Sequence, residues 1–350
     1  MYGFFTSHLL VVADLGSWPR RECTTIHTKA LATLVLLLAI AGTSGHPAQA
    51  ADSAAGSFAL RWENDVFGGT DQNYSNGIGL ALTRPESGIL GAIWNRADSS
   101  DGQLFTTWEL TQLQFTPADL NRIDPDPNDR PYAGVLYVGL ATHLRRERSL
   151  HTAKLILGVV GPSSFAERTQ IVVHKLLNDP QPRGWDYQIK NESIVDLLYE
   201  YHRRLPLTAA NVPLGADCIP MAGGMLGNYL TQVQTQVQCR AGVNLPDDFG
   251  GTTLRESGFL PPPRREPAWG GYLFAGAGGT LVLRDITLDG NTFAHSRSTE
   301  KRPLVPRGEA GAALTTPWCL ITFGYQVWGK TYYHQKNRED FGSLLVSWRF

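Results

Sequence analysis

Seven oxygen-bearing side chains crowd one short stretch of the sequence. They are Glu63, Asn64, Asp65, Asp71, Asn73, Ser75 and Asn76. Apolar and polar residues alternate on both sides of this stretch, so we expect it to form the tip of a β-hairpin. Carboxylate and amide oxygens are the ligands that a hard cation such as Ca²⁺ prefers. Ordinary turn chemistry is the alternative, because Asn, Asp and Gly favour turns for backbone reasons.

Within this hairpin Asp65 is the preferred metal ligand, ahead of Asp71, because a carboxylate at the end of a strand is held in position. Strict alternation would place Asn64 on the opposite face of the strand from Asp65. Both residues can serve one site only if the strand bends or bulges at its end. Glu63 is expected to point inward as a brace.

A single helix is predicted over residues 165–178, which contain helix-forming residues and neither Gly nor Pro. Ser163 or Ser164 is expected to cap this helix, with Glu167 completing a capping box. Gln170 and His174 are four residues apart and therefore share one face. His174 could be a general base, a metal ligand or a surface histidine.

The other candidate residues lie on either side of this helix. Arg130, in the stretch 129–134, could hold a phosphate through its planar guanidinium or could pair with an internal carboxylate. Trp185, Gln188 and Glu192 follow the helix. For Trp185 the alternative is a tryptophan at the membrane interface. For Gln188 and Glu192 it is a structural polar lining of the lumen.

Known catalytic motifs are absent from the sequence. It contains no Gly-x-Ser-x-Gly elbow, no His-Glu-x-x-His helix, no phosphate-binding Walker loop and no Cys/His metal framework. Because Ser163 and Ser164 precede His174 closely, a serine nucleophile is not excluded. The net charge of −1 and the lack of a basic stripe argue against nucleic acid as a partner.

Period-two alternation predicts the elements that position these residues. In 231–239, for example, Val233 and Val237 alternate with glutamines. Segments of this length, with one apolar and one polar face, are typical of a membrane β-barrel. The expected strands number 12: 58–65, 73–84, 103–116, 132–142, 152–160, 187–202, 211–226, 231–239, 269–287, 306–316, 318–333 and 341–350. The last strand ends on Phe350. A C-terminal Phe of this kind resembles the closing strand that outer-membrane assembly machinery recognises.

The N-terminal region predicts export. An apolar run over 30–41 and the small residues of Ala48–Ala50 have the form of a secretory signal peptide, so residues 1–50 are assigned to a leader. Because residues 1–26 are long for a leader, Met1 could precede the true start. Residues 51–350 are then one barrel domain. Export makes a Cys218–Cys239 disulfide feasible, with free thiols as the alternative.

Strand parity then places the candidate residues relative to the membrane. If the N-terminus is periplasmic, the loops after the first, third and fifth strands are extracellular. Those loops are 66–72, 117–128 and 161–186, and they carry or adjoin all the candidate residues. We therefore expect one site at the extracellular rim of an all-β, 12-stranded antiparallel barrel with a short helix in an extracellular loop.

The candidate residues occur in an order that resembles a known family. Glu63-Asn-Asp-Val-Phe, Tyr74-Ser-Asn-Gly, Asp129-Arg-Pro-Tyr-Ala-Gly, His174 in a loop helix and Gly184-Trp-x-x-Gln-x-x-x-Glu192 are similar to the lipid A 3'-O-deacylases of Gram-negative outer membranes. The resemblance covers about residues 58–350. It implies a Ca²⁺-dependent esterase that removes the 3'-linked acyloxyacyl group of lipid A in the outer leaflet.

The resemblance also implies roles for individual residues. His174 would be the general base, with Asn64, Gln170 and Ser75 as catalytic partners and Asp65 in the metal site. Asp179 is a candidate for a second acidic ligand, in a Pro-rich segment that departs from the family pattern, and Glu192 is a third. Arg130, Gln188 and Trp185 would contact the lipopolysaccharide substrate. An outer-membrane phospholipase with a Ser–His pair, and a non-catalytic barrel such as a porin, are the alternatives.

Overall fold

The structure is a computed structural model that describes residues 56–85, 94, 102–209, 212–264 and 269–350. The leader predicted over 1–50 lies outside these residues. In the described part of the chain, no helix is long and apolar enough to cross a membrane.

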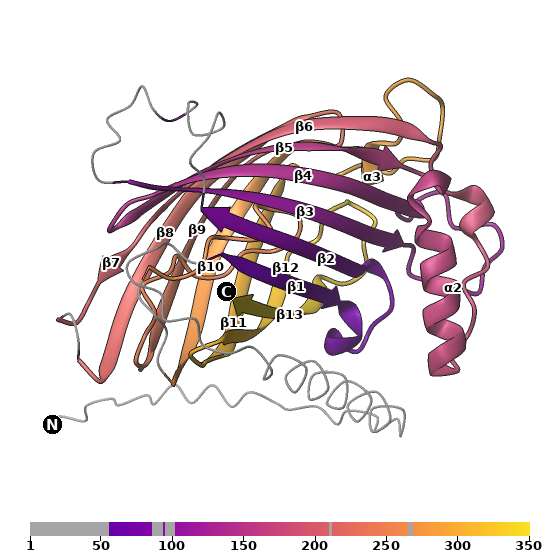
Figure 1. Cartoon of the computed structure of the whole chain (residues 1–350). Helices are drawn as coiled ribbons and strands as arrows, with labels where there is room; N and C mark the ends of the chain where they lie inside the picture. Colours follow the sequence, from indigo (N-terminus) through magenta and orange to yellow (C-terminus); the bar gives the residue numbers. More distant parts are fainter. Residues whose placement is uncertain (1–55, 86–93, 95–101, 210–211, 265–268) are drawn as a thin grey trace, which may run out of the picture. The chain divides into compact units, whose positions relative to one another are not determined.

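One antiparallel sheet closes on itself to form the barrel (Figure 1). Neighbours in the chain pair with each other except β6 (Glu192–Arg203), which pairs with β5 (Ser149–Val160) and β8 (Leu214–Gly227). The first strand, β1 (Ser57–Asn64), pairs with the last, β13 (Glu339–Arg349). The other strands are β2 (Asn73–Pro85), β3 (Gln103–Thr116), β4 (Ala133–Arg145), β7 (Leu205–Pro206), β9 (Leu230–Val243), β10 (Gly270–Asp285), β11 (Leu304–Thr315) and β12 (Cys319–Trp328). Apart from the two-residue β7, this is the predicted 12-stranded barrel.

The two faces of the wall have opposite polarity. On β9, Val233 is 57% exposed, whereas Gln232 and Gln234 point inward and are buried. On β6, Leu197 is exposed while Asp196 is buried. An apolar outer face and a polar interior are what a barrel surrounded by lipid requires.

A segment between β9 and β10 fills the barrel interior. We name residues 248–263 the luminal plug. The backbone N–H of Leu254 donates to Glu63 Oε1 on β1 at 3.1 Å, and Tyr137 on β4 donates its hydroxyl to the Leu254 carbonyl at 3.0 Å. Lys154 on β5 donates to the carbonyl of Glu256 at 2.9 Å. Glu63 is thus confirmed as an inward-pointing brace.

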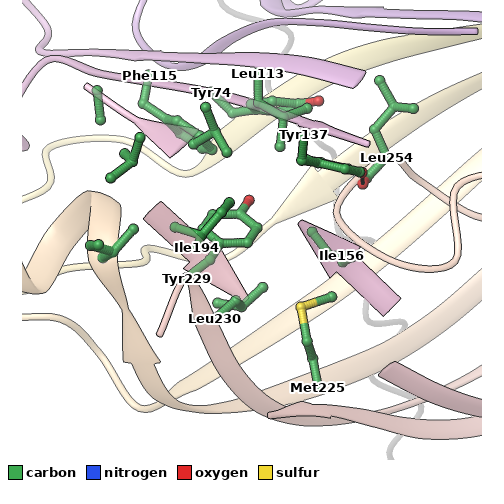
Figure 2. Packing of buried hydrophobic residues seen from close by; sticks show 14 of the residues in the cluster. Tyr74, Leu113, Phe115, Tyr137, Ile156, Ile194, Met225, Tyr229, Leu230 and Leu254 are labelled. Carbon is green, nitrogen blue, oxygen red and sulfur yellow. Dashed lines mark hydrogen bonds between the residues drawn. The ribbon is translucent and has the colours of Figure 1, made fainter. Parts of the chain in front are cut away.

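The plug also takes part in the apolar core of the barrel. Figure 2 shows Leu254 near Tyr137, with Tyr74, Leu113 and Phe115 in the same buried cluster. This packing and the polar contacts hold the plug to strands on several sides of the interior. A filled interior disfavours the porin alternative.

The plug leads to a prediction about conductance. Purified protein reconstituted in a planar lipid bilayer should show no stepwise ion currents, because the plug occupies the path through the barrel. A general porin inserted in parallel would show that the bilayer can report open channels. Stable open-channel currents from this protein would contradict the filled interior.

The three predicted outer loops lie at one end of the barrel. β1, β3 and β5 all run towards this end, which Figure 1 marks with helix α2 (Ala166–Leu177) and the short helix α3 (Ile286–Asp289). The common position of the candidate loops is therefore confirmed. A disulfide joins Cys218 and Cys239 across β8 and β9, so the disulfide alternative is the one observed.

Two local predictions were wrong. The N-cap of α2 is Phe165, in a left-handed conformation with φ 58°, and Ser164 Oγ accepts from the N–H of Ala166 at 3.4 Å, whereas Glu167 contacts Gln188. The predicted capping box is therefore not formed. In addition, the strand predicted from residue 187 begins only at Glu192, because residues 185–187 form a 3₁₀ turn.

Candidate functional site

The outward face of strand β3 changes from apolar to polar near the α2 end of the barrel. In the middle of β3 the outward side chains are apolar, as Trp108 and Leu110 show with exposures of 57% and 48%. Nearer the end, the outward positions carry Gln112, Gln114 and Thr116. Gln114 and Thr116 are buried despite pointing outward. Something other than lipid therefore covers this part of the outer wall.

The cover is the loop that contains α2. Gln112 on β3 donates its side-chain N–H to the carbonyl of Ser164 at 2.7 Å. Gly134 on β4 faces outward, and a Cβ added there would collide with the side chains of Ser164 and Ala166. The start of α2 thus rests on the outer surface of the wall, and only glycine leaves room for it.

This close approach makes Gly134 a sensitive position. We expect Gly134→Ala to displace the start of α2 and to speed tryptic cleavage at Arg168 and Lys175, while the barrel stays folded. Gly308→Ala is the matched control, because a Cβ on that glycine meets no atom closer than 3.9 Å. Equal cleavage rates for both variants would show that the helix does not depend on this contact.

His174 lies on the buried face of α2 and is 7% exposed. Its Nδ1 is 2.7 Å from the carbonyl oxygen of Pro180, and its Nε2 is 3.3 Å from Asp71 Oδ2. A carbonyl can only accept, so Nδ1 carries a proton in this contact. In the neutral ring the lone pair is then on Nε2, which faces Asp71.

The first hairpin supplies the acidic side of this site. Burial raises the pKa of the Asp71 carboxyl, the nearby His174 lowers it, and Asp179 raises it further. Burial, and then the charge of Asp71, raise the pKa of Asp65 well above its ordinary value. Asp71 is therefore the carboxylate that lies within electrostatic range of His174, of Asp179 and of Asp65.

Asp65 has one carboxylate oxygen with partners and one without. Its Oδ2 accepts from the N–H of Gln72 at 2.5 Å and from the Thr70 hydroxyl at 3.4 Å. Its Oδ1 is buried without a hydrogen-bond partner. Such an orphaned oxygen is costly unless a donor or a cation meets it. Among the described residues, however, no group of three or more His, Cys, Asp or Glu side chains is close enough to hold a metal.

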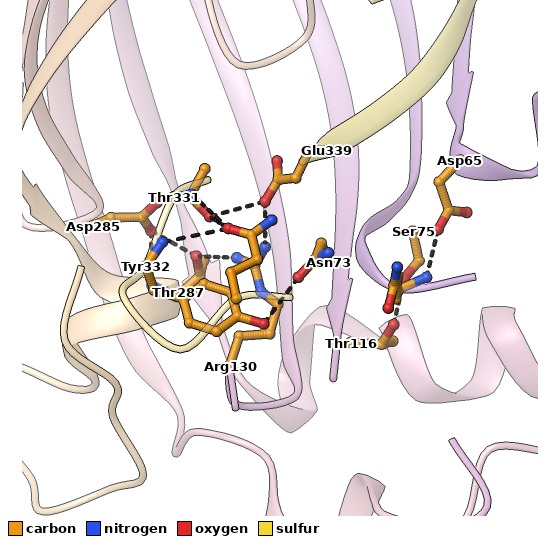
Figure 3. Close-up of polar contacts among 12 residues, drawn as sticks. Asp65, Asn73, Ser75, Thr116, Arg130, Asp285, Thr287, Thr331, Tyr332 and Glu339 are labelled. Carbon is orange, nitrogen blue, oxygen red and sulfur yellow. Dashed lines mark hydrogen bonds and ion pairs between the residues drawn. The ribbon is translucent and has the colours of Figure 1, made fainter. Parts of the chain in front are cut away.

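Asn64 and Ser75 occupy the two strand ends of this hairpin. Asn64 is the N-cap of the 3₁₀ turn Asp65–Gly68, and its Oδ1 accepts from the N–H of Val66 at 2.8 Å. Its Nδ2 donates to Asn76 Oδ1 at 3.2 Å, so Asn64 joins the two strands of the hairpin. Ser75 is the residue at which β2 bulges, and its hydroxyl bonds to that of Thr116 (Figure 3).

Gln170 and Trp185 anchor the two ends of the α2 loop to each other. The indole N–H of Trp185 donates to Gln170 Oε1 at 2.7 Å, and both side chains are buried. The indole also packs against Tyr132, with ring centroids 4.8 Å apart. Trp185 is therefore not exposed to a membrane interface. Gln188 lies outside β6, where its amide contacts Glu167 Oε2 at 3.4 Å.

Two predicted site residues are engaged elsewhere. Arg130 is 1% exposed and donates to Glu339 Oε1 and Thr287 Oγ1, each at 3.1 Å (Figure 3). This is the internal pairing that was predicted as the alternative to substrate binding. Glu192 accepts from Asn228, Asn291 and the N–H of Thr292. Its oxygens hold the β8–β9 and β10–β11 connections, so it is not placed as a metal ligand.

Sequence reasoning passed over two features of this site. Asp71 ranked below Asp65, but it is the carboxylate next to His174. Gln112, Gln114 and Thr116 were not singled out at all. Their signal was present in the sequence as polar residues on the face of β3 that continues from Trp108 and Leu110.

Comparison with known proteins gives the family. The family described as "Outer membrane protein LpxR" matches residues 32–350. The structure of LpxR from Salmonella typhimurium has a TM-score of 0.70 at 16% identity, covering 84% of this chain and 100% of that one. The β domain of the Bordetella autotransporter BrkA has a TM-score of 0.43 at 11% identity, covering 85% and 99%, which is too low to support an argument. No curated protein sequence matches significantly.

The Salmonella protein shares the fold, and the family match spans the barrel together with the loops that carry His174 and Asp65. The chain therefore belongs to the LpxR family of outer-membrane proteins, the lipid A deacylase family that its ordered motifs resemble.

Proposed function

We propose that the protein is a Ca²⁺-dependent esterase that removes the 3'-linked acyloxyacyl group of lipid A in the outer leaflet. The observation that carries this proposal is the position of His174 and Asp71. His174 is buried on α2, Asp71 meets it from the first hairpin, and the start of α2 rests on the outer side of β3 and β4. A lipid ester could approach them from within the membrane plane.

His174 acts as the general base in this proposal. Because the Pro180 carbonyl holds the proton on Nδ1, Nε2 is the atom that accepts a proton from water. The water oxygen then bonds to the ester carbonyl carbon, the bond from that carbon to the sugar oxygen breaks, and the proton passes from Nε2 to the sugar oxygen. Asp71, 3.3 Å from Nε2, stabilises the imidazolium that forms between these steps.

We propose calcium as the cation of the first hairpin. Asp65 and Asp71 would hold it, since burial and mutual repulsion raise the pKa of Asp65 and a cation would relieve both. The unpartnered Asp65 Oδ1 is a ready ligand, and Asp179 is a further candidate. When bound, the ion would polarise the ester carbonyl.

The other predicted residues position these groups. Gln170 and Trp185 lock α2 to the loop that follows it, and Asn64 and Ser75 fix the two arms of the hairpin. Gln188, whose Oε1 is buried without a partner, remains a candidate for contact with the sugar. If the N-terminus is periplasmic, as we propose, strand parity would put all of them at the extracellular rim.

The closing strand suits recognition by the outer-membrane assembly machinery. Phe350 follows β13, and its N–H and carbonyl pair with Gly56 at the start of the barrel. Its side chain is 62% exposed. We propose that this exposed aromatic end is the assembly signal.

A Ser–His phospholipase is less consistent with the contacts. Ser164 donates its hydroxyl to the Gly161 carbonyl at 2.6 Å, and Ser75 bonds to Thr116. In the described part of the chain, no serine hydroxyl hydrogen-bonds to a histidine.

Purified protein in detergent micelles separates the two mechanisms. Incubation with lipid A should release the acyloxyacyl group in calcium and not in excess chelator, and a serine-directed fluorophosphonate should leave the rate unchanged. Inhibition by the fluorophosphonate would favour the serine mechanism. Release at equal rates with chelator would remove calcium from the proposal.

A further inference from the structure

One exposed side of α2 is apolar. Phe165 precedes the helix as its N-cap, and Val172, Val173 and Leu176 lie on one side of its last turns. They are 51%, 53%, 40% and 79% exposed. A second side carries Ala166, Gln170 and His174, which are buried. The helix is thus amphipathic, and its apolar side is exposed.

This face continues the lipid-facing surface of the barrel. The start of α2 rests on the outer side of β3 and β4 through Gln112 and Gly134. Further along the same outer face, Leu110 on β3 and Val138 on β4 are 48% and 54% exposed. Because the wall at these positions contacts lipid, a helix that lies on its outer side at the strand ends lies at the edge of the bilayer.

The charges on α2 are arranged to suit such a position. Arg168 and Lys175 are exposed and seven residues apart, so they flank the apolar face along one side. Cations beside an apolar helix face are typical of helices that lie in a membrane interface, where they meet anionic head groups.

We propose that α2 is a membrane-interface helix, with Phe165, Val172, Val173 and Leu176 among the acyl chains of the surrounding leaflet and Arg168 and Lys175 on its anionic phosphates. The helix then separates lipid on its outer face from His174 on its inner face. It holds the ends of β3 and β4 against the bilayer surface. This inference rests on the barrel's place in the outer membrane and does not depend on esterase activity.

Site-specific fluorescence tests this directly. In a Cys319→Ser background, which removes the free thiol of the described chain, single Cys replacements are made at Leu176, Val138 and Asn121 and labelled with an environment-sensitive fluorophore. The labelled proteins are reconstituted in vesicles of phosphatidylethanolamine and phosphatidylglycerol. Quenching by a lipid carrying a nitroxide near its head group is compared with quenching by aqueous iodide. Val138 is the lipid-facing reference and Asn121, in the exposed 117–129 loop, is the reference for water.

The label at 176 should be quenched by the nitroxide lipid to the same extent as the label at 138, and should be protected from iodide. Quenching by iodide as strong as at 121 would overturn the proposal, because the helix face would then be in water. Protection from both quenchers, together with a dimer in crosslinking, would also overturn it and would identify a second copy as the occupant. Heat-modifiable migration in gels confirms that each labelled barrel is folded.

Discussion

Replacement of His174 by alanine should lower the rate of ester hydrolysis by about 10²–10⁴-fold, the usual contribution of a positioned general base. The loss should appear in kcat, because the imidazole acts on the water and not on substrate binding. Steady-state kinetics of the purified protein with lipid A in micelles would measure it. The barrel should remain folded, since His174 belongs to a loop and not to the wall.

His295→Ala is the matched control for this experiment. His295 is exposed in the β10–β11 loop at the same end of the barrel. Its replacement should leave the kinetics unchanged. A His174→Ala protein that is folded and as fast as the wild type would remove the histidine from the mechanism.

Replacement of Asp65 by asparagine should make the protein more stable when calcium is absent. It should also remove the stabilisation that calcium gives to the wild type. Burial raises the folded-state pKa of Asp65 above its unfolded value, so ionisation of the buried group costs stability as the pH rises. In chelator near pH 8, Asp65→Asn should therefore be more stable than the wild type, by about 1–3 kcal/mol, the typical penalty of an unsatisfied buried group. The difference should vanish below the ordinary pKa of aspartate.

Calcium should reverse this order. The ion should stabilise the wild type against denaturant, as any ligand that binds only the folded state does, and should not stabilise Asp65→Asn. Tryptophan fluorescence during guanidinium unfolding in detergent reports both effects. Asp186→Asn serves as the control, because Asp186 is an exposed carboxylate near the same end. Equal stabilisation of the wild type and Asp65→Asn by calcium would place the ion elsewhere.

Most of the barrel could be predicted from the sequence because a membrane wall repeats one physical rule. Each strand places apolar residues outward and polar residues inward, so alternation shows both the strands and their faces. The rule fails where the environment changes. Strand β6 was predicted to begin at residue 187, because alternation continues through a 3₁₀ turn that no longer belongs to the wall.

The candidate site could be predicted only in part. Strand parity placed the hairpin of Asp65 and the helix of His174 at one end, since parity depends on strand number alone. It could not show which carboxylate meets the imidazole, because that depends on the turn between β1 and β2. The internal pairing of Arg130 with Glu339 joins residues 209 apart in the chain, a distance that spacing does not reveal.

The luminal plug was not predicted at all. Residues 248–263 contain no alternation and several prolines, which is the pattern of an ordinary loop. Their burial follows from luminal polar groups such as Glu63, Tyr137 and Lys154, which need partners inside the barrel. Only the closed sheet brings those groups together around one segment.

Mass spectrometry of lipid A tests the central claim most directly. Lipid A would be extracted from outer membranes of cells that express the wild-type protein or no protein, in the presence of calcium. With the wild type, the main species should lose the mass of the 3'-linked acyloxyacyl group and keep its other acyl chains. Unchanged lipid A in cells whose outer membrane contains the folded, heat-modifiable barrel would contradict the account.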